Sequence, residues 1–255
     1  MNEAGCPGLE LHSYGATHVG RRRKTNEDAY LCDDSLGLWI VADGMGGHAA
    51  GEIASKEACD AIWGMVRRGK SSLEGEPAEG REARAARLLE GAIQSATYMV
   101  FAMAELDVGM TGMGTTISAM MRLHDRVLTA QVGDSRIYRI RGGTEEQLTE
   151  DHTLVAWQIK HGLITEDEAK RSRQRNVITR AVGNRDYVQV DVGWLDVKLG
   201  DAFLLCSDGL HGYLRPDEVA EVAGLGGELS VRRFIDLANS RGGRDNITAV
   251  FVEAW

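Results

Sequence analysis

The chain has 255 residues, of which 43% are hydrophobic and 26% charged, and this composition excludes disorder as its default state. Asp and Glu outnumber Lys and Arg by 38 to 29, and a net charge of −9 argues against non-specific nucleic-acid binding, which relies on basic surface. An acidic chain of this kind is better suited to holding cations. No apolar run is long enough to span a bilayer, and residues 1–13 lack the features of a signal peptide, so we expect a cytoplasmic protein that does not enter a membrane.

The predicted elements of the first half are strands followed by two helices. Short apolar runs bounded by Gly and Asp predict strands at 29–32, 38–42, 115–121 and 127–132. Residues 52–67 carry apolar side chains at helical spacing, and residues 82–106 are rich in Ala, Leu and Met, so both segments predict helices. The polar, Gly-rich segment 69–80 between them predicts an exposed loop.

The second half alternates strands with short helices. Strands are predicted at 137–140, 202–206 and 247–252, and helices at 216–223 and 229–240. Residues 153–174 predict a small helical lid with a break at His161–Gly162 and a capping box from Thr165 to Glu168. Because neighbouring strands are joined by short turns, the pattern favours antiparallel sheets with helices packed outside them. The cysteines form no C-x-x-C pair, which favours reduced thiols over a disulfide framework or a zinc site.

Carboxylates recur at the ends of the predicted strands, beside Gly or Asn. They are Asp28, Asp43, Asp134, Asp208 and Asp245. Each one taken singly is also explained as a turn residue, but the ordered set favours a shared site. Converging carboxylates repel one another unless cations neutralise them, and Mg²⁺ and Mn²⁺ prefer oxygen ligands. Two such ions ~3.5–4 Å apart can activate a bridging water and hold a phosphoryl oxygen.

Eight segments, in order along the chain, resemble the motifs of the metal-dependent protein phosphatases of the PPM type, the protein phosphatase 2C family. They are RRRKTNEDAY, VADGMGGHAAGE, GMGTT, VGDSRIYRI, LTEDHT, NVITRAVG, CSDGL and RDNIT. The resemblance runs from about Tyr14 to Val252, nearly the whole chain. The NED opening and the DGMGGH turn are similar to those of the short bacterial serine/threonine phosphatases.

The resemblance implies an α+β fold, a four-layer α-β-β-α sandwich of two antiparallel sheets flanked by helices, with the metals at one end. It implies an N-terminal tail at 1–13 and a single phosphatase domain at 14–255, with a flap subdomain at about 153–179 that corresponds to the predicted lid. The cations of this flap are expected either to help choose substrates or to form an ordinary solvated face. They are Lys160, Lys170, Arg171, Arg173 and Arg175.

The resemblance also implies a metal site of two Mn²⁺ or Mg²⁺ ions. Asp43 resembles the bridging ligand, and Gly44 would offer its carbonyl oxygen to the second metal. Asp208 and Asp245 resemble the other ligands of the first metal, and Asp28 resembles a ligand of the second, directly or through water. The metal-bridging water would attack phosphorus directly, without a covalent enzyme intermediate.

Three further residues carry expectations from the same resemblance. Asp134, with Asp208, resembles a third and weaker metal site of bacterial members. Arg23 matches the arginine that grips the substrate phosphate, which a guanidinium can hold by two oxygens. Some eukaryotic members have a proton-donating His directly after the Asp-Gly pair, but Met45 stands there in this chain. The nearest histidine is His48, either a proton donor or a structural residue.

The implied function is a protein serine/threonine phosphatase, acting as a monomer on phosphoproteins and paired with a cognate Ser/Thr kinase. Type VI secretion control and cell-wall or growth signalling both stay open as its pathway. One alternative is a catalytically inactive phosphoprotein-binding adaptor, disfavoured because all the expected acids are present. The other is a nucleotide hydrolase, since residues 64–71 match the P-loop pattern G-x-x-x-x-G-K-[ST]. A P-loop follows a strand, whereas a helix is predicted here.

Overall fold

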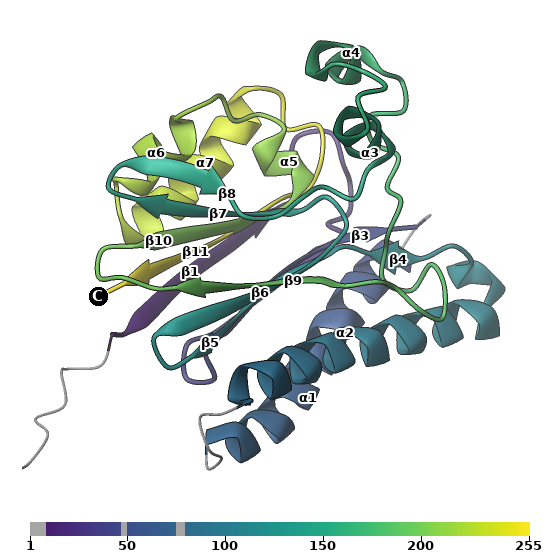
Figure 1. Cartoon of the computed structure of the whole chain (residues 1–255). Helices are drawn as coiled ribbons and strands as arrows, with labels where there is room; N and C mark the ends of the chain where they lie inside the picture. Colours follow the sequence, from purple (N-terminus) through teal and green to yellow (C-terminus); the bar gives the residue numbers. More distant parts are fainter. Residues whose placement is uncertain (1–8, 47–49, 75–79) are drawn as a thin grey trace, which may run out of the picture.

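The structure is a computed structural model that describes residues 9–46, 50–74 and 80–255. Two antiparallel sheets are stacked face to face, and helices cover both outer faces (Figure 1). The predicted α-β-β-α sandwich is therefore confirmed.

The first sheet has the strand order β1-β11-β10-β7-β8. Three helices of the C-terminal part, α5, α6 and α7, pack on its outer face. The strands are β1 (Leu11–His18), β7 (Arg136–Arg141), β8 (Thr144–Gln147), β10 (Ala202–Cys206) and β11 (Ile247–Ala254), and the helices are α5 (Asp208–His211), α6 (Glu218–Ala223) and α7 (Gly227–Ser240).

The second sheet has the order β2-β3-β5-β6-β9, with the short β4 paired to β3. The long helices α1 and α2 lie side by side across its outer face (Figure 1). The strands are β2 (Asp28–Asp33), β3 (Leu38–Met45), β4 (Gly114–Thr115), β5 (Ile117–Leu123), β6 (Arg126–Val132) and β9 (Asp191–Asp196); the helices are α1 (Ala50–Glu74), α2 (Arg81–Leu106) and the 3-10 turn η1 (Val108–Met110).

Alternation along the central strands divides the core into layers. In β3, Leu38 and Ile40 point to α1 and α2, whereas Trp39 and Val41 point to the opposite sheet, and all four are fully buried. Successive side chains of a strand point to opposite faces, so a strand buried on both sides appears in the sequence as a continuous apolar run. Such doubly buried strands were predicted, whereas β1, β8 and β9, which are partly exposed, carry polar residues and were not.

Helix α1 corrects the predicted loop at 69–80. The helix continues through Gly69 and Lys70 to Glu74, and residues 75–79 lie outside the described residues. A Cβ at Gly69 would stand 2.5 Å from Leu88 of α2, so this glycine permits close approach of the two helices instead of ending one. The P-loop match at 64–71 lies within α1, where backbone amides are engaged in the helix and cannot cradle phosphates. Lys70 donates a hydrogen bond to the carbonyl oxygen of Leu36.

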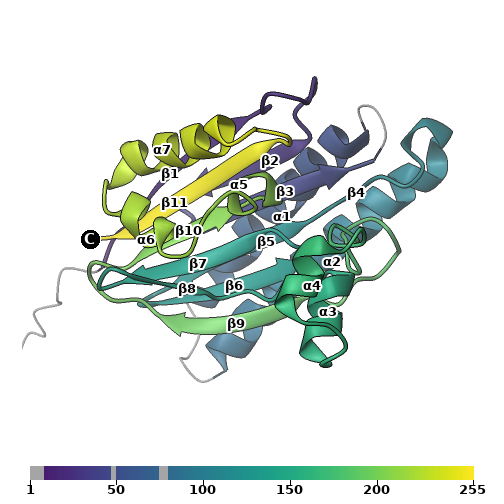
Figure 2. The same ribbon diagram turned by 90° about the horizontal axis from the view of Figure 1, so that it is seen from above.

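The predicted lid forms two short helices, α3 (Leu154–Lys160) and α4 (Glu166–Arg171), which project from the sandwich (Figure 1). Seen from above, they lie at one end of its strands (Figure 2). The capping box is confirmed: the Thr165 hydroxyl accepts from the Glu168 N–H, and the Glu168 carboxylate accepts from the Thr165 N–H at 2.8 Å. At the other end of the domain, β1 begins at Leu11, so residues 11–13 belong to the sheet and not to the predicted tail.

Within the described ranges, no helix combines the length and the apolar character needed to cross a membrane. Three cysteines fall in those ranges, Cys32, Cys59 and Cys206, and each is a free thiol.

Candidate active site

The five predicted acids lie at one end of the sandwich because of strand pairing. Asp134 and Asp245 each stand two residues before a strand, β7 and β11, and Asp208 stands two residues after β10, which pairs with both. These three neighbouring strands therefore place their acids at the same end of the sheet. In the other sheet, Asp28 at the start of β2 is directly paired with Asp43 near the end of β3.

Asp43 is the centre of this group. Burial raises the pKa of the Asp43 carboxyl well above its usual range, and repulsion from each of the other four acids raises it further. Burial also raises the pKa of Asp28 and of Asp134 to about 7. The Asp208 carboxyl, whose pKa is raised by burial and by Asp245, is hydrogen-bonded to Asp43. Two carboxyl groups this close share a proton or a cation, because bare charges would repel.

Hydroxyl groups orient Asp28 from the opposite sheet. The Ser207 hydroxyl donates to Asp28 Oδ2 at 2.9 Å, and the Thr248 hydroxyl donates to the same oxygen at 2.6 Å. The Thr248 N–H in turn donates to Ser207 Oγ at 3.0 Å, so the two hydroxyls belong to one network. This network ties β2 to the ends of β10 and β11 and fixes one oxygen of Asp28.

The backbone of Asp43 is held by two threonines of the GMGTT motif. The Asp43 N–H donates to Thr116 Oγ1 at 2.9 Å, and the Asp43 carbonyl accepts from the Thr115 hydroxyl at 3.0 Å. Next to it, Gly44 is packed so tightly that a Cβ would stand 2.1 Å from the Gly51 carbonyl oxygen. Asp43 and Gly44 are therefore fixed in position before any ligand binds.

Arg23 lies at the same end, beside Asp245. Its Nη2 donates to Asp245 Oδ2 at 2.9 Å, and its Nη1 lies 3.6 Å from Glu27 Oε2. Asn246 holds residues 19–27, which include Arg23, in place. Its Oδ1 accepts from the Glu27 N–H at 2.8 Å, and its Nδ2 donates to the carbonyl oxygens of Val19 and Thr25. The arginine predicted to grip phosphate is thus next to a predicted metal ligand.

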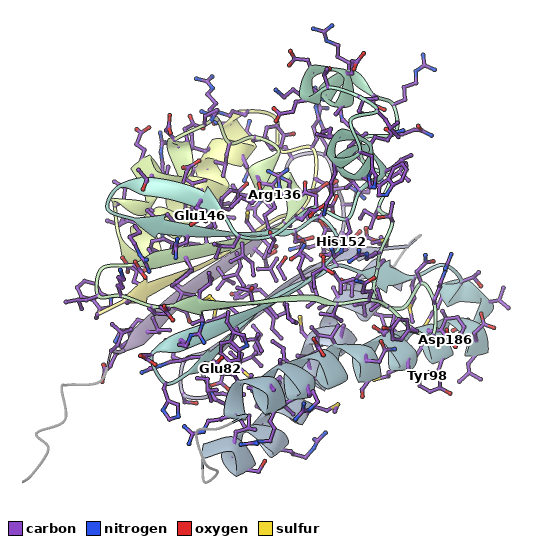
Figure 3. All side chains as sticks on the ribbon, in the orientation of Figure 1. Glu82, Tyr98, Arg136, Glu146, His152 and Asp186 are labelled. Carbon is purple, nitrogen blue, oxygen red and sulfur yellow. The ribbon has the colours of Figure 1, made fainter. Side chains whose placement is uncertain are left out.

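The flap is anchored through His152 to the turn that carries Asp134. The His152 N–H donates to the Gly133 carbonyl at 2.9 Å, and the Gly133 N–H donates to His152 Nδ1 at 3.1 Å. The Thr179 N–H then donates to the His152 carbonyl at 2.8 Å, which closes the base of the flap. Figure 3 shows His152 and Arg136 below α3, where the flap meets the sandwich.

A cavity of about 680 Å³ lies between the acids and the flap. Asp134, Asp208 and Asp245 line one side of it, and residues of α3 and α4 line the other. Asp28 and Asp43 are not among its lining residues. A cavity with carboxylates on one side and a projecting flap on the other can admit a phosphorylated side chain.

The donor set fits hard divalent cations. Within the described residues, no three His, Cys, Asp or Glu side chains are already drawn together tightly enough to hold a metal ion. Burial raises the pKa of Asp43, and the charges of the other four acids raise it further, so these carboxylates lie near one another. Oxygen donors whose mutual repulsion a cation would relieve are the ligands that Mn²⁺ and Mg²⁺ prefer.

The structure thus brings together Arg23 and all five predicted acids, whereas His48 lies outside the described residues and its role stays a prediction. Sequence reasoning missed the residues that hold the acids in place. They are Thr115, Thr116, Ser207, Asn246, Thr248 and His152. Each one lies within a few residues of a predicted acid or inside one of the eight motifs. Its place in the sequence could therefore have identified it as part of the site.

Comparisons with known proteins show what the chain is similar to. The sequence profile of the family described as Protein phosphatase 2C matches residues 14–244. A serine/threonine phosphatase, stp, of Listeria welshimeri is 36% identical over 248 residues, which cover 95% of this chain and 96% of that protein.

Solved structures show the same fold. PppA, described as a key regulatory component of the type VI secretion system in Pseudomonas aeruginosa, superposes with a TM-score of 0.81 at 34% identity, covering 96% of this chain and 98% of that one. The catalytic domain of the serine/threonine protein phosphatase PstP, solved in complex with two manganese ions, superposes with a TM-score of 0.82 at 32% identity, covering 96% and 99%.

Proposed function

We propose that this chain, which belongs to the protein phosphatase 2C family, hydrolyses phosphoserine and phosphothreonine in proteins with Mn²⁺ or Mg²⁺ as its cofactor. The observation that carries the proposal is the convergence of four acids on Asp43 at the side of a cavity. A buried group of like charges costs stability, and it is explained by the cations that it would hold.

Each acid has a part in holding the ions. Asp43 stands between the two sheets' acids and would bridge the ions, with the carbonyl of Gly44 beside it. Asp208 and Asp245 would complete one site and Asp28 the other, while Asp134 with Asp208 would hold a third, weaker ion. When bound, the ions supply positive charge to the phosphoryl oxygens and lower the pKa of a water molecule that attacks phosphorus.

Arg23 positions the phosphate. Its guanidinium, already oriented by Asp245 and Glu27, can hold two phosphate oxygens in a fork and keep phosphorus next to the acids. The protein's contribution is positioning and charge stabilisation, which suits phosphoryl transfer to water without a covalent enzyme intermediate.

The proposal extends to the organisation of the protein and its partners. One catalytic domain reaching residue 255 would act as a cytoplasmic monomer, with the flap at about 153–179 beside the cavity. Its substrates would be phosphoproteins, which the names of the related serine/threonine phosphatases support. Its partner would be the Ser/Thr kinase that phosphorylates them.

Phosphate release from a phosphothreonine peptide tests the function, measured with Mn²⁺, with Mg²⁺ and with EDTA. ATP serves as the parallel substrate. We expect release from the peptide with either metal and none with EDTA. Failure to release phosphate from the peptide with any metal would favour the phosphoprotein-binding adaptor, and hydrolysis of ATP alone would contradict the assignment to protein substrates.

A further inference from the structure

The cavity between the acids and the flap contains more than the metal site. Its flap side is apolar where α3 and α4 meet, lined by Val155, Ala156, Ile159 and Ala169. Around this apolar surface stand four cations, Arg136, Lys170, Arg175 and Arg244. A single phosphorylated side chain does not need so large a lining, so the cavity has room for residues on both sides of it.

Two of the four cations are already neutralised. Arg136 donates to both oxygens of Asp151, at 2.8 and 2.7 Å. Lys170 lies 3.5 Å from Asp167 Oδ1, and Glu166, which also lines the cavity, stands one helical turn before it on α4. These cations therefore offer little charge to a ligand.

Arg175 and Arg244 differ from them. Both side chains are exposed, and within the described ranges neither guanidinium forms a hydrogen bond or ion pair with the protein. They come from opposite sides of the cavity, Arg175 from the flap and Arg244 from the segment that leads into β11. Arg244 is held in place by its backbone, whose N–H donates to Tyr213 Oη at 3.0 Å, and it directly precedes the predicted ligand Asp245.

We propose, on the basis of the function above, that this enzyme prefers phosphopeptides with Asp or Glu on both sides of the phosphorylated residue, and that Arg175 and Arg244 are the residues that select them. A guanidinium pairs with a carboxylate through two parallel hydrogen bonds. Five acids also line the cavity, but the metal ions of the proposed function would neutralise Asp134, Asp208 and Asp245, and the other two, Asp151 and Glu166, stand beside Arg136 and Lys170. The carboxylates of an acidic peptide would therefore pair with Arg175 and Arg244. The apolar surface of α3 and α4 would contact the aliphatic stems of the same peptide.

Matched phosphothreonine peptides with Glu, Gln or Lys on both sides of the phosphothreonine test the proposal. The readout is the ratio of kcat/KM between the Glu-flanked and Gln-flanked peptides in the Mn²⁺-loaded enzyme. We expect the Glu-flanked peptide to be favoured over the Gln-flanked one about threefold to tenfold, and the Lys-flanked peptide to be the poorest. The preference should weaken as salt is raised from 0.05 to 0.5 M, because salt screens exposed charges.

Single substitutions test which arginines cause the preference. Arg244→Gln should reduce the ratio toward one, and Arg175→Glu should reduce it to one or below. Arg175→Lys keeps the charge but not the paired hydrogen bonds, so it should retain only part of the preference. Arg173→Glu is the matched control, since Arg173 is an exposed flap cation that does not line the cavity, and it should leave the ratio unchanged.

Two results would overturn the proposal. Equal kcat/KM for the three peptides in the unmodified enzyme would show that the flanks are not selected, and an equal loss in Arg173→Glu would show only a general charge effect. Hydrolysis of p-nitrophenyl phosphate separates these results from failure of the proposed function. An enzyme that hydrolyses neither this small ester nor any peptide would refute both proposals, whereas hydrolysis without flank preference would refute this one alone.

Discussion

At the scale of single residues, the acids of the site oppose folding unless something neutralises them. Asp43 and Asp208 share a hydrogen bond, and burial raises the pKa values of Asp28 and Asp134 to about 7. A carboxyl whose pKa is higher in the folded than in the unfolded protein destabilises the folded state at pH values where it must ionise. Such a site lowers the stability of the metal-free protein and favours the binding of divalent cations.

Asp134→Asn tests this cost in the metal-free protein. The pKa of Asp134 is about 7 in the folded chain against an ordinary value of 3.8, so no penalty exists below about pH 4 and the full penalty is reached once the pH exceeds 7. The asparagine variant should therefore melt at a higher temperature than the unmodified protein in EDTA. The gain should grow from pH 5 to pH 7 and level off by pH 8, as measured by thermal unfolding. A gain that is independent of pH would contradict the assigned cause.

Arg23→Ala tests the phosphate-binding role. Loss of a charge-assisted hydrogen bond that forms in the substrate complex should raise KM for a phosphopeptide, roughly tenfold or more, with a smaller effect on kcat. Steady-state kinetics of the metal-loaded variant check this. An unchanged KM would argue against phosphate binding by Arg23.

At the scale of elements, the long helices are positioned by packing, whereas the short helix α6 adds an ion pair to its packing. Helices α1 and α2 are held by their buried apolar faces and by the close approach at Gly69. In contrast, α6 begins at Glu218, whose carboxylate accepts from both terminal nitrogens of Arg241, each at 2.6 Å. Arg241 follows α7 and also donates to the Tyr213 carbonyl, so one ion pair joins α6 to α7 near the site.

Glu218→Gln should destabilise the protein in a pH-dependent way. The Arg241 side chain lowers the pKa of Glu218 to about 2 from its ordinary 4.5. The stabilisation is present above pH 4.5 and is lost as the pH falls from 4.5 to 2. The variant should melt a few degrees lower than the unmodified protein at pH 7, and the difference should shrink at pH 4 and further at pH 3.

Glu228→Gln is the control for this measurement, because the Glu228–Arg232 pair of α7 is exposed and such pairs contribute little. Equal losses in the two variants, or a loss at Glu218 that stays constant down to pH 3, would contradict the explanation.

At the scale of the whole molecule, the sequence predicts the layers because central strands are buried on both faces. Residues 38–42, 202–206 and 247–252 appear as apolar runs for this reason, and each forms a strand. The edge strands β1 and β9 are only partly buried, and β1 contains Gly15, so their sequences contain no continuous apolar run. Gly69 shows the reverse error, since a glycine that permits helix packing was interpreted as a breaker.

The residues of the site that could be predicted are those that occur in motifs at the ends of predicted strands. Asp43, Asp208 and Asp245 were found in this way, and the structure places them together. The hydroxyls of Ser207 and Thr248 were not found, because their role depends on which strands are neighbours across the two sheets. Pairings of this kind are set by tertiary structure, since Thr248 and Asp28 are separated by 220 residues.

Mn²⁺ binding to the purified protein, followed by titration calorimetry together with turnover, tests the central claim that the strand-end acids hold the metals. We expect the unmodified protein to bind at least two ions, as PstP does, and Asp43→Asn to lose this binding and to reduce turnover more than about a hundredfold while remaining folded. Asp196→Asn, at an exposed carboxylate of β9, should bind and turn over normally. Undiminished Mn²⁺ binding by Asp43→Asn would contradict the account.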